Sequence, residues 1–232
     1  MNAQMVMERN ERNISLKKAM VIFTVLFYSA WAVFELAAKP WMSENIKNEA
    51  LFSILEDGVI KNLVWTLPAM LLVSCYSSDM YVGLKDMFTQ KVNRLRYLPV
   101  FLVFAAYNLC GAYLSHGKLG ISGRFGIGEI ICVLFVGLTE EMVFRGWLLN
   151  ATLGKDKKKQ WTAVLLNAVM FLVIHFPIWI KKGIFVTNFT SMGFIVLMIL
   201  SVIFSVSFIK SKNILVPITL HMFWDLMQFM LF

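Results

Sequence analysis

The sequence predicts an all-α protein, a polytopic bundle of transmembrane helices. The chain has 232 residues, of which 59% are hydrophobic, and its mean hydropathy is +0.69. Several runs reach the roughly 20 apolar residues that a helix needs to cross a bilayer. The net charge of +8 comes from basic residues between these runs, a pattern typical of membrane topology. These observations exclude a soluble domain and give no reason to expect nucleic-acid binding.

We expect about seven spans, with eight as the alternative. They are predicted at residues 19–38, 59–77, 97–114, 127–153, 161–180, 188–209 and 213–232. The first follows a basic tail, but it is too long for a signal peptide and has no small-x-small cleavage site, so we expect a retained anchor. Pro68 should kink the second span rather than break it.

The connections between the spans are polar, basic or rich in glycine. We expect an amphipathic polar stretch at 39–58, a basic loop at 79–96 with a short interfacial helix near 82–88, and a glycine-rich link at 117–128. The N-terminal tail and the connections on its side of the membrane hold fourteen lysines and arginines, and the connections on the opposite side hold seven. This bias predicts a cytoplasmic N-terminus. We divide the chain into N-terminal spans without motifs (1–121) and a motif-bearing core (122–232).

Three charged residues lie inside the fourth predicted span, at Glu140, Glu141 and Arg145. Charges at membrane depth are costly and usually functional. Glu141 and Arg145 are four residues apart, so on a helix they can pair on one face. Glu140 lies about 100° further round the helix and is left without an intrahelical partner. Glu140 is therefore the carboxylate available for chemistry.

Two histidines lie in later spans and could meet Glu140. His175 follows Phe171 by one turn, and Asp225 follows His221 by one turn. At 1.5 Å per residue, Glu140, His221 and Asp225 can meet near the midplane or in the inner half, whereas His175 lies somewhat too far out unless its helix tilts or enters later. The depth of His221 favours a cavity that opens toward the cytoplasm.

This set of side chains suggests peptide hydrolysis. A glutamate in a cavity of low dielectric constant can take a proton from water near neutral pH. Histidines can orient that water, hold a divalent metal that acidifies it, or stabilise the developing oxyanion. A zinc site made by His175, His221 and Glu140 and a metal-free glutamate base both remain open.

The ordered motifs resemble those of the CPBP family. They are Glu140-Glu141-x-x-x-Arg145, Phe171-x-x-x-His175 and His221-x-x-x-Asp225. This family groups type II CAAX prenyl endopeptidases (Rce1-like) with bacteriocin-processing and Abi self-immunity proteins. The resemblance covers about residues 122 to 232.

The resemblance implies an intramembrane protease with Glu140 as the catalytic glutamate and His175 beside the attacking water. It gives His221 and Asp225 a role in handling the water, a metal or the oxyanion. Members often carry Asn at the position of Asp225, and Asn can donate to an oxyanion whereas Asp can do so only when protonated. Orienting His221 or binding a metal is therefore an equally good role for Asp225. Glu141, Arg145 and Phe171 are expected to support the site.

Three hypotheses follow, of which an endopeptidase acting on a membrane-associated, lipidated or secreted peptide is the first. The second is a non-catalytic bacteriocin-immunity or scaffold protein that binds a partner, and the third is an ion or proton pathway. The sequence has no HExxH, no GxGD pair and no rhomboid-like serine motif. Small size and the lack of a soluble domain favour a bacterial plasma-membrane protein surrounded by lipid.

Overall fold

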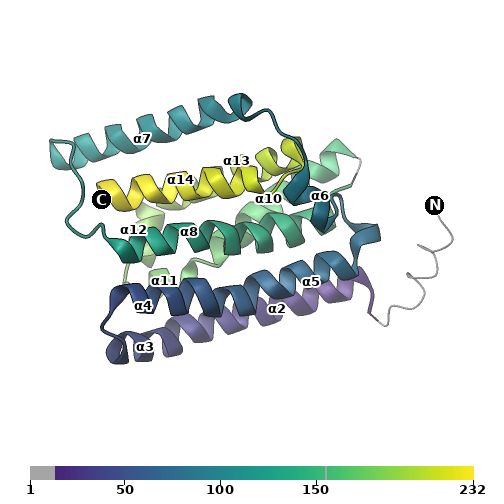
Figure 1. Ribbon diagram of the computed structural model, residues 1–232, viewed down its shortest axis with the longest axis horizontal. Helices are drawn as coiled ribbons and strands as arrows, with labels where there is room; N and C mark the ends of the chain where they lie inside the picture. The colour runs from purple at the N-terminus through teal and green to yellow at the C-terminus, as the bar shows by residue number, and fades with distance from the viewer. Residues whose placement is uncertain (1–13, 155) are drawn as a thin grey trace.

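The computed structural model is a bundle of α-helices lying side by side, with no strand among the residues it describes (Figure 1). It describes residues 14–154 and 156–232. Arg9, Arg12 and Lys155, which the topology count includes, lie outside them. The predicted fold class is confirmed.

The first two helices form a hairpin and are longer than the sequence predicts. The first runs through α2 (Leu16–Val33), η1 (Phe34–Ala38) and α3 (Lys39–Asn45), and the second through α4 (Glu49–Ser53), η2 (Ile54–Ile60), η3 (Asn62–Thr66) and α5 (Leu67–Cys75). The expected polar stretch at 39–58 is wrong, because its acidic residues Glu56 and Asp57 are buried inside the second helix. They pair with lysines there, so the helix continues through them. Pro68 lies in the first turn of α5 and does not break the helix.

A short helix and a long one follow, and they lead to the central helix of the bundle. They are α6 (Leu84–Thr89) and α7 (Leu98–His116), and α6 confirms the predicted helix in the basic loop. The central helix comprises α8 (Ile127–Glu141), the π-helical η6 (Met142–Leu149) and α9 (Asn150–Thr152). It packs against both the N-terminal hairpin and the last helix.

The predicted fifth and sixth spans are each broken near one end. The fifth comprises α10 (Lys157–Val173) and α11 (Phe176–Lys181), and the sixth α12 (Phe185–Thr190) and α13 (Gly193–Ser211). The last helix is α14 (Leu215–Leu231). His175 lies at the break between α10 and α11, so a depth calculated along one straight helix does not apply to it.

Within the described residues, five helices are long and apolar enough to cross a membrane: Leu16–Asn45, Glu49–Cys75, Arg94–His116, Lys157–Lys181 and Gly193–Ser211. The central helix is of comparable length but carries the charged motif, and Leu215–Leu231 is apolar but shorter. The chain is thus a multi-pass membrane protein, while the count of seven spans stays a prediction.

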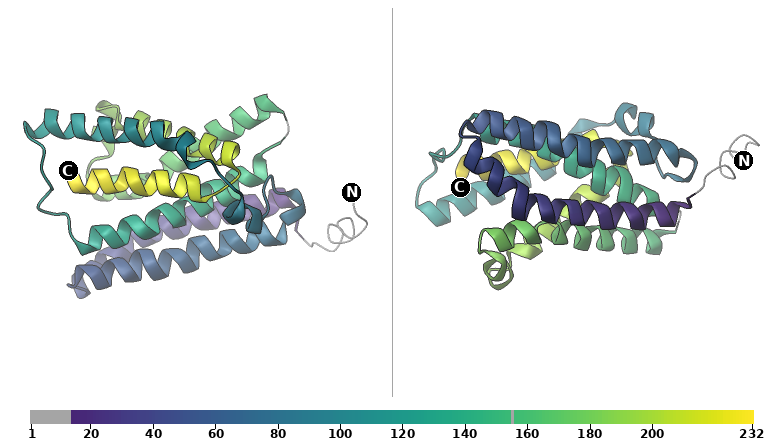
Figure 2. Two further views of the ribbon diagram at one scale, coloured as in Figure 1. Left: turned by 45° about the horizontal axis from the view of Figure 1, so that its top comes forward. Right: turned by 90° about the horizontal axis from the view of Figure 1, so that it is seen from below.

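Two ends of the bundle can be told apart by their contacts (Figures 1 and 2). At one end, Tyr76 Oη donates to the carbonyl of Ile14 at 2.8 Å, and Asn150 exchanges two hydrogen bonds with the backbone of Val82, both 2.8 Å. At the other end, the amide of Ser122 donates to the carbonyl of Met230 at 2.7 Å. We call these the N-terminal end and the C-terminal end.

Candidate active site

A buried ion pair anchors the charged motif of the central helix. Arg145 Nη1 donates to Glu141 Oε1 at 2.9 Å, and both side chains are fully buried. The predicted pairing of these two residues is confirmed. Arg145 Nη2 also donates to Ser201 on α13, at 2.7 Å to Oγ and 3.0 Å to the carbonyl oxygen. The guanidinium therefore joins the central helix to α13.

His221 on α14 contacts all three carboxylates of the motifs. Its Nδ1–H donates to Glu141 Oε1 at 2.9 Å. Its Nε2 consequently faces the other two, at 3.9 Å from Glu140 Oε2 and 3.4 Å from Asp225 Oδ2. Glu141 thus fixes the ring by a hydrogen bond, and Asp225 lies where it can orient the same ring.

Close packing of α8 on α14 makes these contacts possible. A Cβ on Gly137 would lie 2.6 Å from Met222 Cγ and 3.3 Å from the carbonyl oxygen of Ile218. Glycine lets the two backbones approach closely here. Because Gly137 precedes Glu140 by one turn and Met222 follows His221 directly, the crossing point lies beside the carboxylates.

Glu140 differs from Glu141 in its hydrogen bonds: Glu141 Oε1 accepts two and only its Oε2 lacks one, whereas neither oxygen of Glu140 has a hydrogen bond among the described residues. The residue is 9% exposed, and its Oε2 is buried without a hydrogen bond among the described residues. Buried polar atoms are nearly always hydrogen-bonded, so an exception calls for an explanation. Glu140 lines a pocket, and a water or a polar substrate atom in that pocket would supply the missing bond.

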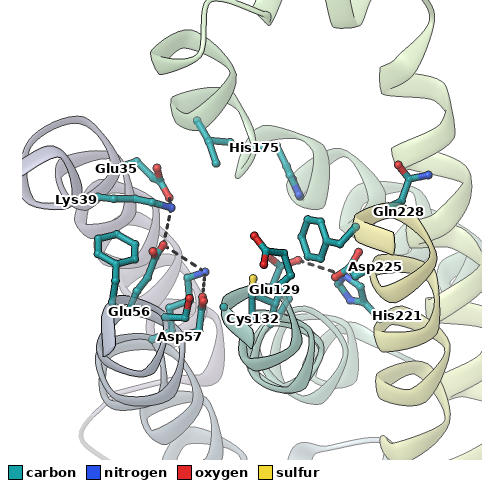
Figure 3. A pocket seen from close by; sticks show the side chains of 18 of the residues that line it. Glu35, Lys39, Glu56, Asp57, Glu129, Cys132, His175, His221, Asp225 and Gln228 are labelled. Carbon is teal, nitrogen blue, oxygen red and sulfur yellow. Dashed lines mark hydrogen bonds and ion pairs between the residues drawn. The ribbon is translucent and has the colours of Figure 1, made fainter. Parts of the chain in front are cut away.

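His175 reaches the same pocket from the break between α10 and α11. Its Nδ1–H donates to the carbonyl of Phe171 at 2.8 Å, so Nε2 is the nitrogen that remains free. Figure 3 shows its ring directed into the space between the N-terminal helices and α14. No hydrogen bond joins His175 to Glu140 or His221 within the part of the chain that the structure describes. The structure places His175 across the pocket from them.

Phe171 holds the two histidines and the arginine in place. Its ring lies 5.1 Å from His175 and 5.9 Å from His221, both edge-on. The Arg145 guanidinium lies 4.6 Å from the centre of the same ring, an attractive cation–π distance. Phe204 on α13 stacks on His221 at 4.9 Å. All predicted supporting residues thus contact the site.

The pocket that contains Glu140 and both histidines has a volume of about 930 Å³. One face of α8 and one face of α14 supply its floor and one wall. The lining residues on those helices are Gly128, Glu129, Cys132, Val136, Glu140, His221, Trp224, Asp225, Gln228 and Phe229. Their spacing of three and four residues is that of a single helix face.

The opposite wall of the pocket is charged, a feature that was not predicted from the sequence. Lys39 Nζ bridges Glu35 and Glu56 at 3.2 and 2.6 Å, and Lys61 Nζ pairs with Asp57 at 2.5 Å. We call these five residues the N-terminal ion network. They lie on η1, α3 and η2, with Lys61 directly after η2. Their side chains line the pocket (Figure 3). The Lys61 ammonium also lies 5.1 Å from the ring of Trp31 and 5.9 Å from that of Trp65. The sequence did contain a signal for this network. Glu35 and Lys39, and likewise Asp57 and Lys61, are oppositely charged residues four apart in apolar surroundings, as Glu141 and Arg145 are.

The zinc alternative stays a prediction. Within the described ranges, no group of three His, Cys, Asp or Glu side chains is placed to hold a metal ion. Nδ1 of His175 is bonded to the Phe171 carbonyl and Nδ1 of His221 to Glu141, which leaves the Nε2 atom of each ring as the nitrogen that could bind a metal.

Residues 126–227 match the family model of the type II CAAX prenyl endopeptidase Rce1-like proteins. Over these residues the chain is similar to the Rce1-like family. The Rce1-like match begins at the start of α8 and ends within α14, so it includes Glu140, His175, His221 and Asp225. The family is one of membrane proteases, which supports an endopeptidase. The N-terminal ion network lies outside the match.

No curated protein and no solved structure matches the chain. The Rce1-like assignment therefore rests on the family model and agrees with the motifs.

Proposed function

We propose that the protein is an intramembrane endopeptidase in which Glu140 activates the attacking water. The observation that carries this proposal is the buried, unpartnered Oε2 of Glu140 in a pocket shared with His175 and His221. The substrate would be a membrane-associated, lipidated or secreted peptide. The Rce1-like match supports the reaction class.

The reaction would begin with a water between Glu140 and His175. Glu140 takes one proton from it while the water oxygen attacks the carbonyl carbon of the scissile bond. His175 Nε2, left free by the bond of Nδ1 to Phe171, would orient that water. A positioned carboxylate base typically accelerates such a step about 10² to 10⁴-fold.

The tetrahedral intermediate would carry its negative charge on the former carbonyl oxygen. A protonated His221 Nε2, on the pocket side of its ring, would donate to it, and preorganised donors of this kind are usually the largest single contribution to catalysis. The C–N bond then breaks, and the proton on Glu140 passes to the leaving amine. Asp225, 3.4 Å from His221 Nε2, would orient the ring.

The test compares the native host carrying the wild-type protein with one carrying Glu140→Gln, with peptide termini in membrane and secreted fractions profiled by mass spectrometry. The substitution keeps size but removes the base. Glu44→Gln, on the exposed part of α3, is the matched control. Termini that vanish in Glu140→Gln alone, at equal protein amounts, support the peptidase.

Identical termini in all three strains would refute the peptidase. A phenotype retained by Glu140→Gln would then favour the partner-binding immunity or scaffold function.

A further inference from the structure

The pocket is reached from one end of the bundle. Its outermost lining residues, Lys47, Arg124, Lys182 and Phe232, are all exposed. Lys47 and Arg124 lie in the connections before α4 and before α8, and Lys182 follows α11. All of these connections lie at the C-terminal end of the bundle (Figures 1 and 2). The rim of the pocket is therefore at the C-terminal end.

The N-terminal end is closed by hydrogen bonds between its connections. Asn150 binds both backbone groups of Val82, and the amide of Ile214 donates to the carbonyl of Met87 at 2.7 Å. No residue of these connections lines the pocket among the described ranges. His221 lies nearer the closed end, where α14 begins, and the pocket extends from it toward the C-terminal end.

The closed end carries most of the positive charge. Eleven described lysines and arginines lie there: Lys17, Lys18, Lys85, Lys91, Arg94, Arg96, Lys157, Lys158, Lys159, Lys210 and Lys212. Six lie at the pocket end: Lys39, Lys47, Lys118, Arg124, Lys181 and Lys182. Of these six, Lys39 is held in the N-terminal ion network. Basic residues in short connections are retained on the cytoplasmic side of a membrane.

We propose that the pocket opens on the extracytoplasmic face, so that the substrate is a peptide segment presented from that side rather than a cytoplasmic C-terminus. The direction of opening follows from the lining residues and the charge bias alone. The statement about the substrate rests in addition on the proposed peptidase function. The N-terminal ion network then faces the incoming segment across the pocket from Glu140.

Site-directed labelling tests the orientation without any assay of proteolysis. In a background with Cys75, Cys110 and Cys132 replaced by alanine, single cysteines are introduced by Lys47→Cys and Arg124→Cys at the rim. Lys91→Cys and Lys158→Cys, equally exposed at the closed end, are the matched controls. Intact cells are treated with a membrane-impermeant maleimide before and after permeabilisation.

We expect the two rim cysteines to react in intact cells and the two controls to react only after permeabilisation. Rim cysteines that react only after permeabilisation, or controls that react in intact cells, would overturn the proposed orientation. Two positions at each end protect the result against a single variant that fails to fold.

The proposal that the substrate comes from the extracytoplasmic side is tested separately, by the positions of the cleavage sites. The cleavage sites lost in Glu140→Gln should map to extracytoplasmic or secreted segments. Sites that map to cytoplasmic segments would overturn it even when the rim is labelled from outside. If the rim cysteines are labelled in intact cells but no peptide termini depend on Glu140, the proposed orientation is supported and the peptidase function is refuted.

Discussion

Glu140 and Glu141 are neighbours in sequence but differ in their hydrogen bonds. Glu141 Oε1 accepts from both Arg145 and His221, whereas neither oxygen of Glu140 accepts a hydrogen bond from any residue that the structure describes. Breaking a buried ion pair is costly because the remaining charge stays uncompensated. We therefore expect Glu141 to have a structural role and Glu140 to be the carboxylate that reacts.

We expect Glu141→Gln to destabilise the protein by about 3 to 5 kcal/mol, since it leaves Arg145 buried without a counter-charge. Glu140→Gln should keep the wild-type unfolding temperature while it abolishes cleavage. Thermal unfolding of both variants in detergent measures the difference. Equal stability of the two variants would contradict the assignment of separate roles.

The roles of the two ring nitrogens of His175 can be tested separately in the same way. Asn can replace the bond of Nδ1–H to the Phe171 carbonyl but places no group where Nε2 lies. Gln places an amide near the Nε2 position. We expect His175→Asn to fold normally with cleavage reduced about 10² to 10⁴-fold, and His175→Gln to retain more activity. The reverse order in a cleavage assay would argue against a role for Nε2.

At the scale of elements, the crossing of α8 and α14 sets the distance between the carboxylates and His221. A Cβ on Gly137 would require Met222 to move, because real Cβ atoms do not approach to 2.6 Å. We expect Gly137→Ala to cost about 1 to 3 kcal/mol of stability and to lower cleavage. Gly120→Ala is the control, since nothing lies within 4 Å of its Cβ position. Unfolding temperatures that match in both variants would count against the tight crossing.

The connections at the closed end are held together by the side chain of Asn150. Asn150→Ala would leave the amide and carbonyl of Val82 without their partners. Each buried group left unpaired costs about 1 to 3 kcal/mol. We expect the variant to unfold at a lower temperature, and hydrogen exchange at Val82 to accelerate. Unchanged exchange there would show that the contact does not close this end.

The order of the helices was predictable because apolar runs and the charged residues of the core motif are local signals. Glu141 and Arg145 were paired from their spacing alone. The partner of His221 was not predictable, since the choice between Glu140 and Glu141 depends on how α14 crosses α8. The break at His175 was missed although the sequence carries a signal for it: Pro177 lies in the first turn of α11, and a proline ends or kinks a helix just before it.

At the scale of the molecule, the pocket belongs to both halves of the chain. The N-terminal ion network supplies one wall, and Phe27 on α2 contacts Phe144 on η6 with ring centres 5.8 Å apart. The network went unnoticed because polar residues were expected to end a span, whereas paired charges can stay inside one. The parts of the chain before and after residue 121 therefore pack against each other.

We expect a fragment comprising residues 122–232 to be unstable and inactive alone, because it exposes the aromatic surface that packs on α2. Co-expression with residues 1–121 should restore a complex that co-purifies and cleaves substrate. A fragment that is active by itself would show that the N-terminal wall is dispensable.

The aromatic lining of the pocket gives it an optical property of its own. Three of the seven tryptophans, Trp31, Trp65 and Trp224, line the pocket, and two of them lie beside the Lys61 ammonium. Indole emission depends on the polarity and charge around the ring, so a peptide that displaces water here should alter the spectrum of the whole protein. Titrating candidate peptides into Glu140→Gln and recording fluorescence would then rank ligands without any turnover.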